Sequence, residues 1–420
     1  TDPSRPLLLT PQVISINGKY EIAVQVPFTT TNPASPSRHT LLAVANDRIA
    51  SAAGLWPNHP SRWHSAQAGA DIAMVTYGPF AASLAPLVSA HQAEGKSSAV
   101  VPINDLYDEF NFGERSPFAI KQFLWTATHN WKKPPTYLLL NGRASFDPRN
   151  YLGLGGLDLV PTRIVPSSSL MTSSDDWFSD FNNSGIPTIA TGRLPVGTAD
   201  EAATVVGKIA TYEGQSTNGP WTSNALMVAD TDDTESFTLD TQTVQAKLPA
   251  TIQVSDVFTG TVGAAEARTD ILNAINSGQV LVNYLGHGSE EQWSGADIFD
   301  TTSVSSLTNG SQLPVFLIMD CLNGFFQDVN SQPLGVSLLL ASNGGAVAVL
   351  ASSGLNQPAP QTNLDALVVQ NAVSAKGERL GDAIVKAKSH IGDPDVRRTF
   401  VLFGDPAMKV KPPSANMTTH

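Results

Sequence analysis

The stretch VLVNYLGHGSEEQW (280–293) begins as an almost wholly apolar run and then opens abruptly onto glycines and charged residues. A short apolar run of this kind is typical of a buried strand in a parallel sheet. A second run, LPVFLIMD (313–320), has the same character and leads directly into Cys321. His287 and Cys321 thus each follow a predicted buried strand. Because neighbouring parallel strands end at the same sheet edge, we expect the two side chains to meet there.

The residue types at these two strand ends suit acyl transfer to sulfur. A thiolate is the reactive form of cysteine, and an imidazole can carry the proton between the thiol and a leaving amine. Because Gly288 has no side chain, its backbone N–H can point at the carbonyl oxygen of a substrate. The Gly288 and Cys321 N–H groups together form a candidate oxyanion hole. The spacing alone also fits a plainer interpretation, in which Cys321 is a small buried core residue.

Alternating strand and helix patterns indicate an α/β fold on both sides of this region. We predict two parallel-sheet α/β lobes with helices on both faces, preceded by a short β-rich N-terminal segment. The expected domains are a β-rich segment over 1–65, an N-terminal lobe over 66–215, a catalytic lobe over 216–412 and a tail over 413–420. In the first segment, two alternating runs around Asn17-Gly18 predict a β-hairpin.

The composition excludes several classes of protein. A net charge of −12 over 420 residues argues against a nucleic-acid partner, and no apolar run is long enough to span a membrane. The single cysteine excludes an internal disulfide and a multi-cysteine zinc site. The sequence starts without a signal-peptide pattern, so we expect a processed, secreted or cell-surface chain whose partners are proteins or peptides. The sequence leaves the oligomeric state open.

The residues around both strand ends resemble a known family. NYLGHGSEEQW (283–293) and CLNGFF (321–326) resemble the histidine and cysteine motifs of the gingipain family of cysteine peptidases, the C25 group. Further similar blocks follow in the family's order over about residues 65–410, namely FDPRNYLG, SDDWF, GRLPVGTADEA, NGGAVAVLASSG and LFGDPAMKV. The resemblance implies a caspase-like fold and a cysteine endopeptidase that needs no cofactor for its chemistry.

The resemblance also implies roles for single residues. His287 becomes the general base and acid, Cys321 the nucleophile, and the Gly288 and Cys321 N–H groups the oxyanion donors. A carboxylate after the first strand of the catalytic lobe orients the imidazole in the family. Asp232 fits that place, with Asp230 as the alternative, although both are also explained as solvated loop carboxylates.

For substrate binding, Asp240 stands where Arg-cleaving members place the aspartate of the primary pocket, which favours a basic P1 residue. A helix N-cap explains the same aspartate equally well. We expect the Asn356–Gln357 backbone to line this pocket and Trp293 to wall the active-site loop. Pro358-Ala359-Pro360 replaces a tryptophan of the Arg-cleaving pattern, which weakens the case for strict Arg specificity.

A calcium loop is a further expectation from the resemblance. Relatives carry D-x-D-x-D-G where this chain has Asp180, Asn182, Ser184 and Gly185, so one carboxylate of three is retained. Any calcium binding at this loop would therefore rest on a single retained carboxylate of the pattern. Two alternatives to a hydrolase stay open: a sortase-like transpeptidase that passes the acyl group to an amine, and a catalytically idle surface-binding module.

Overall fold

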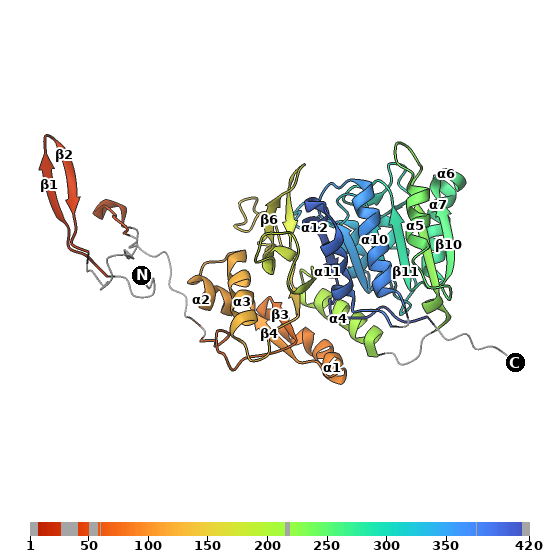
Figure 1. The fold of residues 1–420 in the computed structure, drawn as a ribbon, viewed down its shortest axis with the longest axis horizontal. Helices are drawn as coiled ribbons and strands as arrows, with labels where there is room; N and C mark the ends of the chain where they lie inside the picture. The colour runs from red at the N-terminus through yellow and green to blue at the C-terminus, as the bar shows by residue number, and fades with distance from the viewer. Residues whose placement is uncertain are drawn as a thin grey trace. The chain divides into compact units, whose positions relative to one another are not determined.

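The structure is a computed structural model that describes residues 7–26, 41–49, 58, 60–214, 219–374 and 376–413. The chain divides into two compact units, residues 1–57 and 58–420 (Figure 1). From residue 414 onward, the predicted tail lies outside the described part.

In the first unit, β1 (Gln12–Ile16) and β2 (Lys19–Ala23) pair antiparallel, which confirms the predicted hairpin. The turn residues Asn17 and Gly18 have φ of +52° and +76°, a left-handed conformation that asparagine and glycine adopt most readily. A short 3₁₀ helix, η1 (Asn46–Arg48), also belongs to this unit.

The second unit is built on one ten-stranded sheet with the order β10-β9-β11-β14-β15-β16-β8-β5-β3-β4. All neighbouring strands pair parallel except β15 and β16, which pair antiparallel. The two predicted lobes are therefore two parallel runs of opposite direction, joined in one sheet through β16. The strands are β3 (Ile72–Thr76), β4 (Ser98–Pro102), β5 (Tyr137–Asn141), β8 (Ala190–Leu194), β9 (Asn224–Ala229), β10 (Gln253–Phe258), β11 (Leu281–Leu285), β14 (Val315–Met319), β15 (Ala348–Ser352) and β16 (Phe400–Phe403).

Two small antiparallel pairs of strands lie outside this sheet. The four-residue strands β6 (Arg163–Pro166) and β7 (Met171–Ser174) form one, and the two-residue strands β12 (Gln292–Trp293) and β13 (Phe299–Asp300) form the other. The helices are α1 (Ala85–Ala93), α2 (Ile103–Asn111), α3 (Pro117–Asn130), α4 (Ala199–Gly214), α5 (Phe237–Gln245), α6 (Thr259–Val262), α7 (Ala264–Asn276), α8 (Thr301–Val304), α9 (Leu334–Leu340), α10 (Pro358–Ala372), α11 (Leu380–His390) and α12 (Pro394–Thr399). Three further 3₁₀ helices are η2 (Gly78–Leu84), η3 (Asp176–Phe178) and η4 (Pro220–Ser223).

Both faces of the sheet are covered at β11, one of them by helix α10 and the other by the β12 segment. Successive residues of β11 show this, because adjacent side chains of a strand point to opposite faces. Asn283 donates to Asp365 of α10 at 2.7 Å, while Tyr284 stacks on Trp293 from the other face with ring centroids 4.4 Å apart. All five residues of β11 and of β14 are buried, which explains their unbroken apolar runs. Within the described residues, no helix has the length and apolarity to cross a membrane.

Candidate active site

The register of β11 and β14 places His287 beside Cys321. These strands are parallel neighbours, and their last registered pair is Leu285 with Met319. The Gly286 N–H continues the pairing by donating to the Met319 carbonyl oxygen at 3.3 Å. His287 and Cys321 each lie two residues beyond that last pair. The predicted neighbourhood of the two strands is thereby confirmed, and both residues leave the sheet at one edge.

Close contacts between the two strand ends require the glycines that flank His287. A Cβ on Gly288 would lie 2.0 Å from Oδ2 of Asp320, and one on Gly286 would lie 2.4 Å from the Tyr284 hydroxyl oxygen. Both distances are far shorter than any ordinary Cβ contact. Gly288 therefore lets the histidine loop pack directly on the cysteine strand, while Gly286 leaves room for the Tyr284 hydroxyl and for Asp230, in addition to any role in admitting substrate.

Hydrogen bonds hold His287 at its backbone and at one ring nitrogen. Its backbone N–H donates to buried Asp230 at 3.2 Å, and its carbonyl oxygen accepts from the Tyr284 hydroxyl at 2.6 Å. The ring nitrogen Nε2 lies 2.9 Å from Oδ2 of Asp233. Phe237 meets the ring edge-on at a centroid distance of 5.2 Å. With Nε2 engaged, Nδ1 is the nitrogen available for proton transfer.

The carboxylate on the ring is thus Asp233, which the sequence analysis did not single out. Asp232 instead serves the start of α5: its oxygens accept from the Thr238 N–H at 2.9 Å and from the Ser236 hydroxyl at 3.2 Å. Asp230 reaches the backbone of His287 rather than its ring. A hydrogen bond from the Glu235 backbone and the one shared with His287 lower the pKa of Asp233, which keeps this exposed carboxyl ionised.

Cys321 is half-buried, and its surroundings favour the protonated thiol over the thiolate. Burial raises the pKa of this thiol above its ordinary value, and the neighbouring Asp320 acts in the same direction. Sγ lies 3.9 Å from the Asn356 carbonyl oxygen. Among the described residues the structure records no hydrogen bond between this thiol and the imidazole. Attack by sulfur therefore requires a base that approaches the thiol, and His287 is on the adjacent strand end.

The backbone turns sharply after Cys321. Leu322 has φ of +68°, an uncommon conformation for a residue with a branched side chain, and such outliers cluster at functional sites. The N–H groups of Leu322 and Gly324 donate to Gly354 and Ser352 carbonyl oxygens at 3.2 and 2.8 Å. These bonds hold the turn without using the Cys321 N–H.

The histidine loop leaves the other predicted oxyanion donor available as well. Gly288 bridges to Trp293 through bonds from Ser289 N to Gln292 O and from Ser294 N to His287 O, so the bridge does not use the Gly288 N–H. Buried Asn323 was missed by sequence reasoning. Its side-chain amide donates to the Ser289 carbonyl oxygen and, at 3.4 Å, to that of Gln292, which ties the two loops together.

The predicted pocket residues gather near the start of α10. Asn356 contacts the thiol, and Gln357 is the exposed N-cap residue of this helix. Asp240 on α5 accepts a hydrogen bond from Thr362 of α10, and burial raises the pKa of Asp240. This carboxyl is therefore close to the segment beside Cys321. Its role in substrate binding stays a prediction.

Trp293, which we expected to wall the active-site loop as part of the substrate-binding group, has no surface exposed to a substrate. Its side chain is fully buried, stacked on Tyr284 and packed against Phe299 and Phe316. Stacking on Tyr284 places the indole in the core beneath the histidine loop, and the backbone bridge between Trp293 and Gly288 ties it to that loop.

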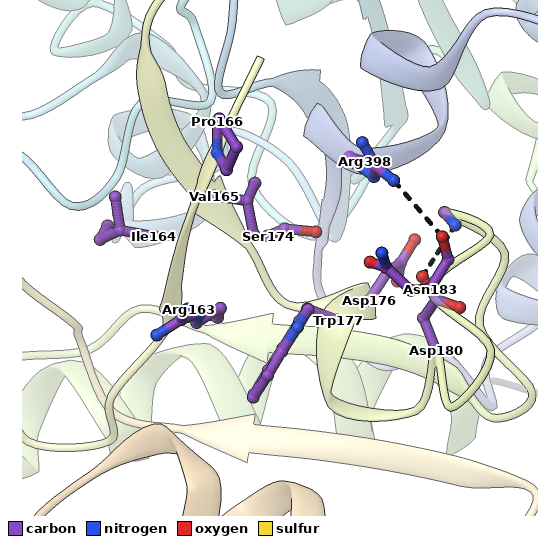
Figure 2. Close-up of a pocket in the computed structure, with 11 residues that line it drawn as sticks. Arg163, Ile164, Val165, Pro166, Ser174, Asp176, Trp177, Asp180, Asn183 and Arg398 are labelled. Carbon is purple, nitrogen blue, oxygen red and sulfur yellow. Dashed lines mark hydrogen bonds between the residues drawn. The ribbon is translucent and has the colours of Figure 1, made fainter.

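The loop predicted to bind calcium borders a cavity of about 240 Å³ between β6, η3 and α12, which Figure 2 shows with Asp180, Asn183 and Arg398. The two carboxylate oxygens of Asp180 accept from the N–H groups of Ser184 and Gly185 at 2.8 and 2.7 Å. Asn182 and Ser184 are exposed. One carboxylate whose oxygens both accept N–H bonds is a poor ligand set for Ca²⁺, which needs six to eight oxygen ligands. The residues present do not fit a calcium site.

The sequence is similar to those of known cysteine peptidases. Gingipain R2 and gingipain R1 of Porphyromonas gingivalis are each 28% identical to the chain over 250 residues. The alignments cover 57% of this chain but only 31% and 23% of those relatives, so the chain spans less than a third of their length.

Solved structures show the same fold. The Arg-specific cysteine proteinase gingipain R (RgpB) superposes with a TM-score of 0.68 at 22% identity, over 85% of this chain and 80% of that one. A complex of the pro- and mature domains of RgpB from Porphyromonas gingivalis gives a TM-score of 0.66 at 21% identity, over 81% and 79% of the two chains. The family model described as peptidase family C25 matches residues 65–411, which is most of the sequence. The chain therefore belongs to peptidase family C25.

Proposed function

We propose that the protein is a cysteine endopeptidase in which Cys321 is the nucleophile and His287 the general base and acid. The observation that carries this proposal is the parallel register of β11 and β14, which delivers the only cysteine of the chain and a histidine to one sheet edge. Membership of a peptidase family supports it.

The reaction begins when Nδ1 of His287 takes the proton from the Cys321 thiol as sulfur attacks a peptide carbonyl carbon. A carbon–sulfur bond forms, and the Gly288 and Cys321 N–H groups stabilise the negative oxygen of the tetrahedral intermediate. The carbon–nitrogen bond then breaks, and the imidazolium returns the proton to the leaving amine. Water, deprotonated by His287, resolves the thioester and regenerates the thiol.

Asp233 and Asp230 position the imidazole in this scheme. Asp233 accepts from Nε2–H, which leaves the Nδ1 lone pair available to take the thiol proton and stabilises the imidazolium. Asp230 holds the His287 backbone from inside the core. Both act through the histidine and are positioning residues.

Substrates with a basic P1 residue follow from the charge near α10. Asp240 is half-buried beside the helix that starts next to Cys321, and a charge-assisted hydrogen bond to Arg or Lys contributes about 1.5–3 kcal/mol. The gingipain R structure that shares this fold is that of an Arg-specific proteinase, which supports this proposal. A secreted or cell-surface location is proposed from the resemblance to the gingipains.

The test is cleavage of a P1-randomised peptide library by the wild-type chain, by Cys321→Ala and by Asp240→Asn. We expect no cleavage by Cys321→Ala with unchanged folding by circular dichroism. Asp240→Asn should lose about 10- to 100-fold in kcat/KM on Arg and Lys peptides and little on neutral ones. Wild-type turnover by Cys321→Ala would disprove the peptidase proposal. An unchanged P1 preference in Asp240→Asn would disprove only the pocket assignment.

Mass spectrometry of the products with an added amine separates hydrolysis from transpeptidation, because a transpeptidase yields products that carry the amine. An acyloxymethyl ketone with a basic P1 residue labels Cys321 in an active enzyme and leaves an idle binding module unmodified. A calcium chelator should leave hydrolysis unchanged, given the poor fit of the Asp180 loop.

A further inference from the structure

Three side chains with metal-ligating atoms meet far from Cys321. His91 on α1, Glu213 on α4 and Asp405 after β16 bring one imidazole nitrogen and two carboxylate oxygens within 4.8 Å of one another. Helices α1 and α4 pack side by side there (Figure 1). Among the described residues, this is the single group of three or more His, Cys, Asp or Glu side chains with such spacing.

The cluster lies at the sheet edge opposite the catalytic pair. β16 runs antiparallel to β15, whereas β14 runs parallel to it. Asp405 follows the end of β16, so it lies at the edge where β14 begins, and Cys321 follows the end of β14. A ligand at this cluster therefore does not share the peptidase site.

Two of the three side chains are fully buried, and the carboxylate of the third, half-buried Glu213, has no hydrogen-bond partner among the described residues. His91 and Asp405 are fully buried. Both carboxylate oxygens of Glu213 are shielded from solvent and accept no hydrogen bond from the residues described. A buried carboxylate without a partner carries a desolvation cost that a proton or a metal ion removes. Burial raises the pKa of Glu213 to about 9, an effect that Asp405 and Glu94 increase and that Arg379 and Lys411 only partly oppose.

Neighbouring groups already orient the ligand atoms. Nδ1 of His91 lies 3.2 Å from the Ser98 hydroxyl oxygen, so a proton on Nδ1 can be donated there while Nε2 faces the carboxylates. Nε2 is 2.6 Å from Oδ2 of Asp405, whose other oxygen accepts the Ala407 N–H at 3.0 Å. Metal-ligating histidines in proteins commonly have their second nitrogen bonded in this way.

We propose that His91, Glu213 and Asp405 bind a divalent transition-metal ion of the Zn²⁺ type. One imidazole and two carboxylates form a mixed nitrogen–oxygen set that suits zinc in tetrahedral geometry with a fourth ligand from solvent. Ligand atoms on tetrahedral zinc lie about 3.3 Å apart, so the His91–Asp405 contact must open by about 0.7 Å on binding. The ion joins α1, α4 and the segment after β16, and so stabilises the junction of the two parallel runs.

The experiment uses the full chain in a Cys321→Ala background, which removes the thiol as a competing zinc ligand and prevents self-cleavage. Metal is stripped with a chelator, and ZnCl₂ is titrated by isothermal titration calorimetry and by thermal unfolding. Glu213→Gln is the test variant, because it keeps the shape of a protonated carboxyl but removes the anionic ligand. Glu94→Gln is the matched control, a nearby glutamate outside the three-ligand cluster that pairs with Arg379 at 2.8 Å.

We expect one Zn²⁺ per chain and a zinc-dependent rise in Tm for the background protein and for Glu94→Gln. Glu213→Gln should fold normally without metal and bind Zn²⁺ at least tenfold more weakly. Absence of stoichiometric zinc binding in the background protein would overturn the proposal. Equal zinc affinity in Glu213→Gln and in the background protein would overturn it too. If zinc raises the Tm of neither the background protein nor Glu94→Gln, the proposal is also overturned, and the cluster is a protonated histidine–carboxylate network.

Discussion

Gly288→Ala tests the contact between the two loops that the active site depends on. The added Cβ would lie 2.0 Å from Oδ2 of Asp320, and real Cβ contacts are rarely shorter than 3.0 Å, so something must move by about 1 Å. Asp320 is fully buried and adjoins Cys321, so the shift separates the histidine loop from the nucleophile. Overpacking of this size costs about 1–3 kcal/mol of folding free energy. A 1 Å misplacement of reacting groups lowers turnover by about 100-fold.

Gly295→Ala is the matched control in the same loop region, because a Cβ there meets nothing within 4 Å. We expect urea unfolding to show a loss of stability for Gly288→Ala and little change for Gly295→Ala. The kcat/KM on a peptide substrate should fall about 100-fold for Gly288→Ala alone. In Gly288→Ala/Asp320→Ala the closest remaining contact is 2.9 Å from Cβ of residue 320, so much of the lost stability should return. Equal stability and activity of the two alanine variants would refute the proposed packing.

Three further substitutions probe the surroundings of the site. Asp233→Ala should lower kcat/KM less than about fivefold, because exposed ion pairs such as Asp233–His287 are weak; a much larger loss would show that this pair contributes more than an exposed ion pair does. Asn323→Ala leaves two carbonyl oxygens without their amide donor and should cost about 1–3 kcal/mol in urea unfolding; wild-type stability would contradict the loop link. Burial raises the pKa of Asp365 to about 8, so between about pH 4 and 8 this carboxyl is protonated in the folded chain and ionised in the unfolded chain. Its contribution to the free energy of unfolding therefore falls as pH rises over that range, by about 1.4 kcal/mol per pH unit. Asp365→Asn should flatten that dependence in unfolding measured across this pH range, and an unchanged slope would contradict it.

The sequence predicted well that the strands before His287 and Cys321 are buried parallel neighbours. Continuous burial of β11 and β14 left a clear apolar pattern in the sequence, and the separation of 34 positions between His287 and Cys321 suited neighbouring parallel strands. The union of both lobes in one sheet was not predictable. The four residues of β16 carry no signal for strand direction, yet this strand reverses the sheet.

The role of a single residue was harder to predict where several residues of the same chemical type are neighbours in the sequence. The run TDDTES (231–236) offers neighbouring carboxylates, and only the turn into α5 decides that Asp232 serves the helix while Asp233 reaches the ring. Trp293 was misplaced because its burial depends on stacking with Tyr284. The cluster of His91, Glu213 and Asp405 unites distant parts of the chain and leaves no local pattern.

The most direct test of the Cys321–His287 pair is the pH dependence of Cys321 alkylation by iodoacetamide in the wild-type chain and in His287→Ala. This measurement needs no knowledge of the substrate. We predict that the wild-type thiol is alkylated at pH 7 at least tenfold faster than the thiol of His287→Ala, because the imidazole takes the thiol proton. The rate in His287→Ala should approach the wild-type rate only at alkaline pH, where hydroxide deprotonates the thiol. Superimposable profiles would contradict the pairing.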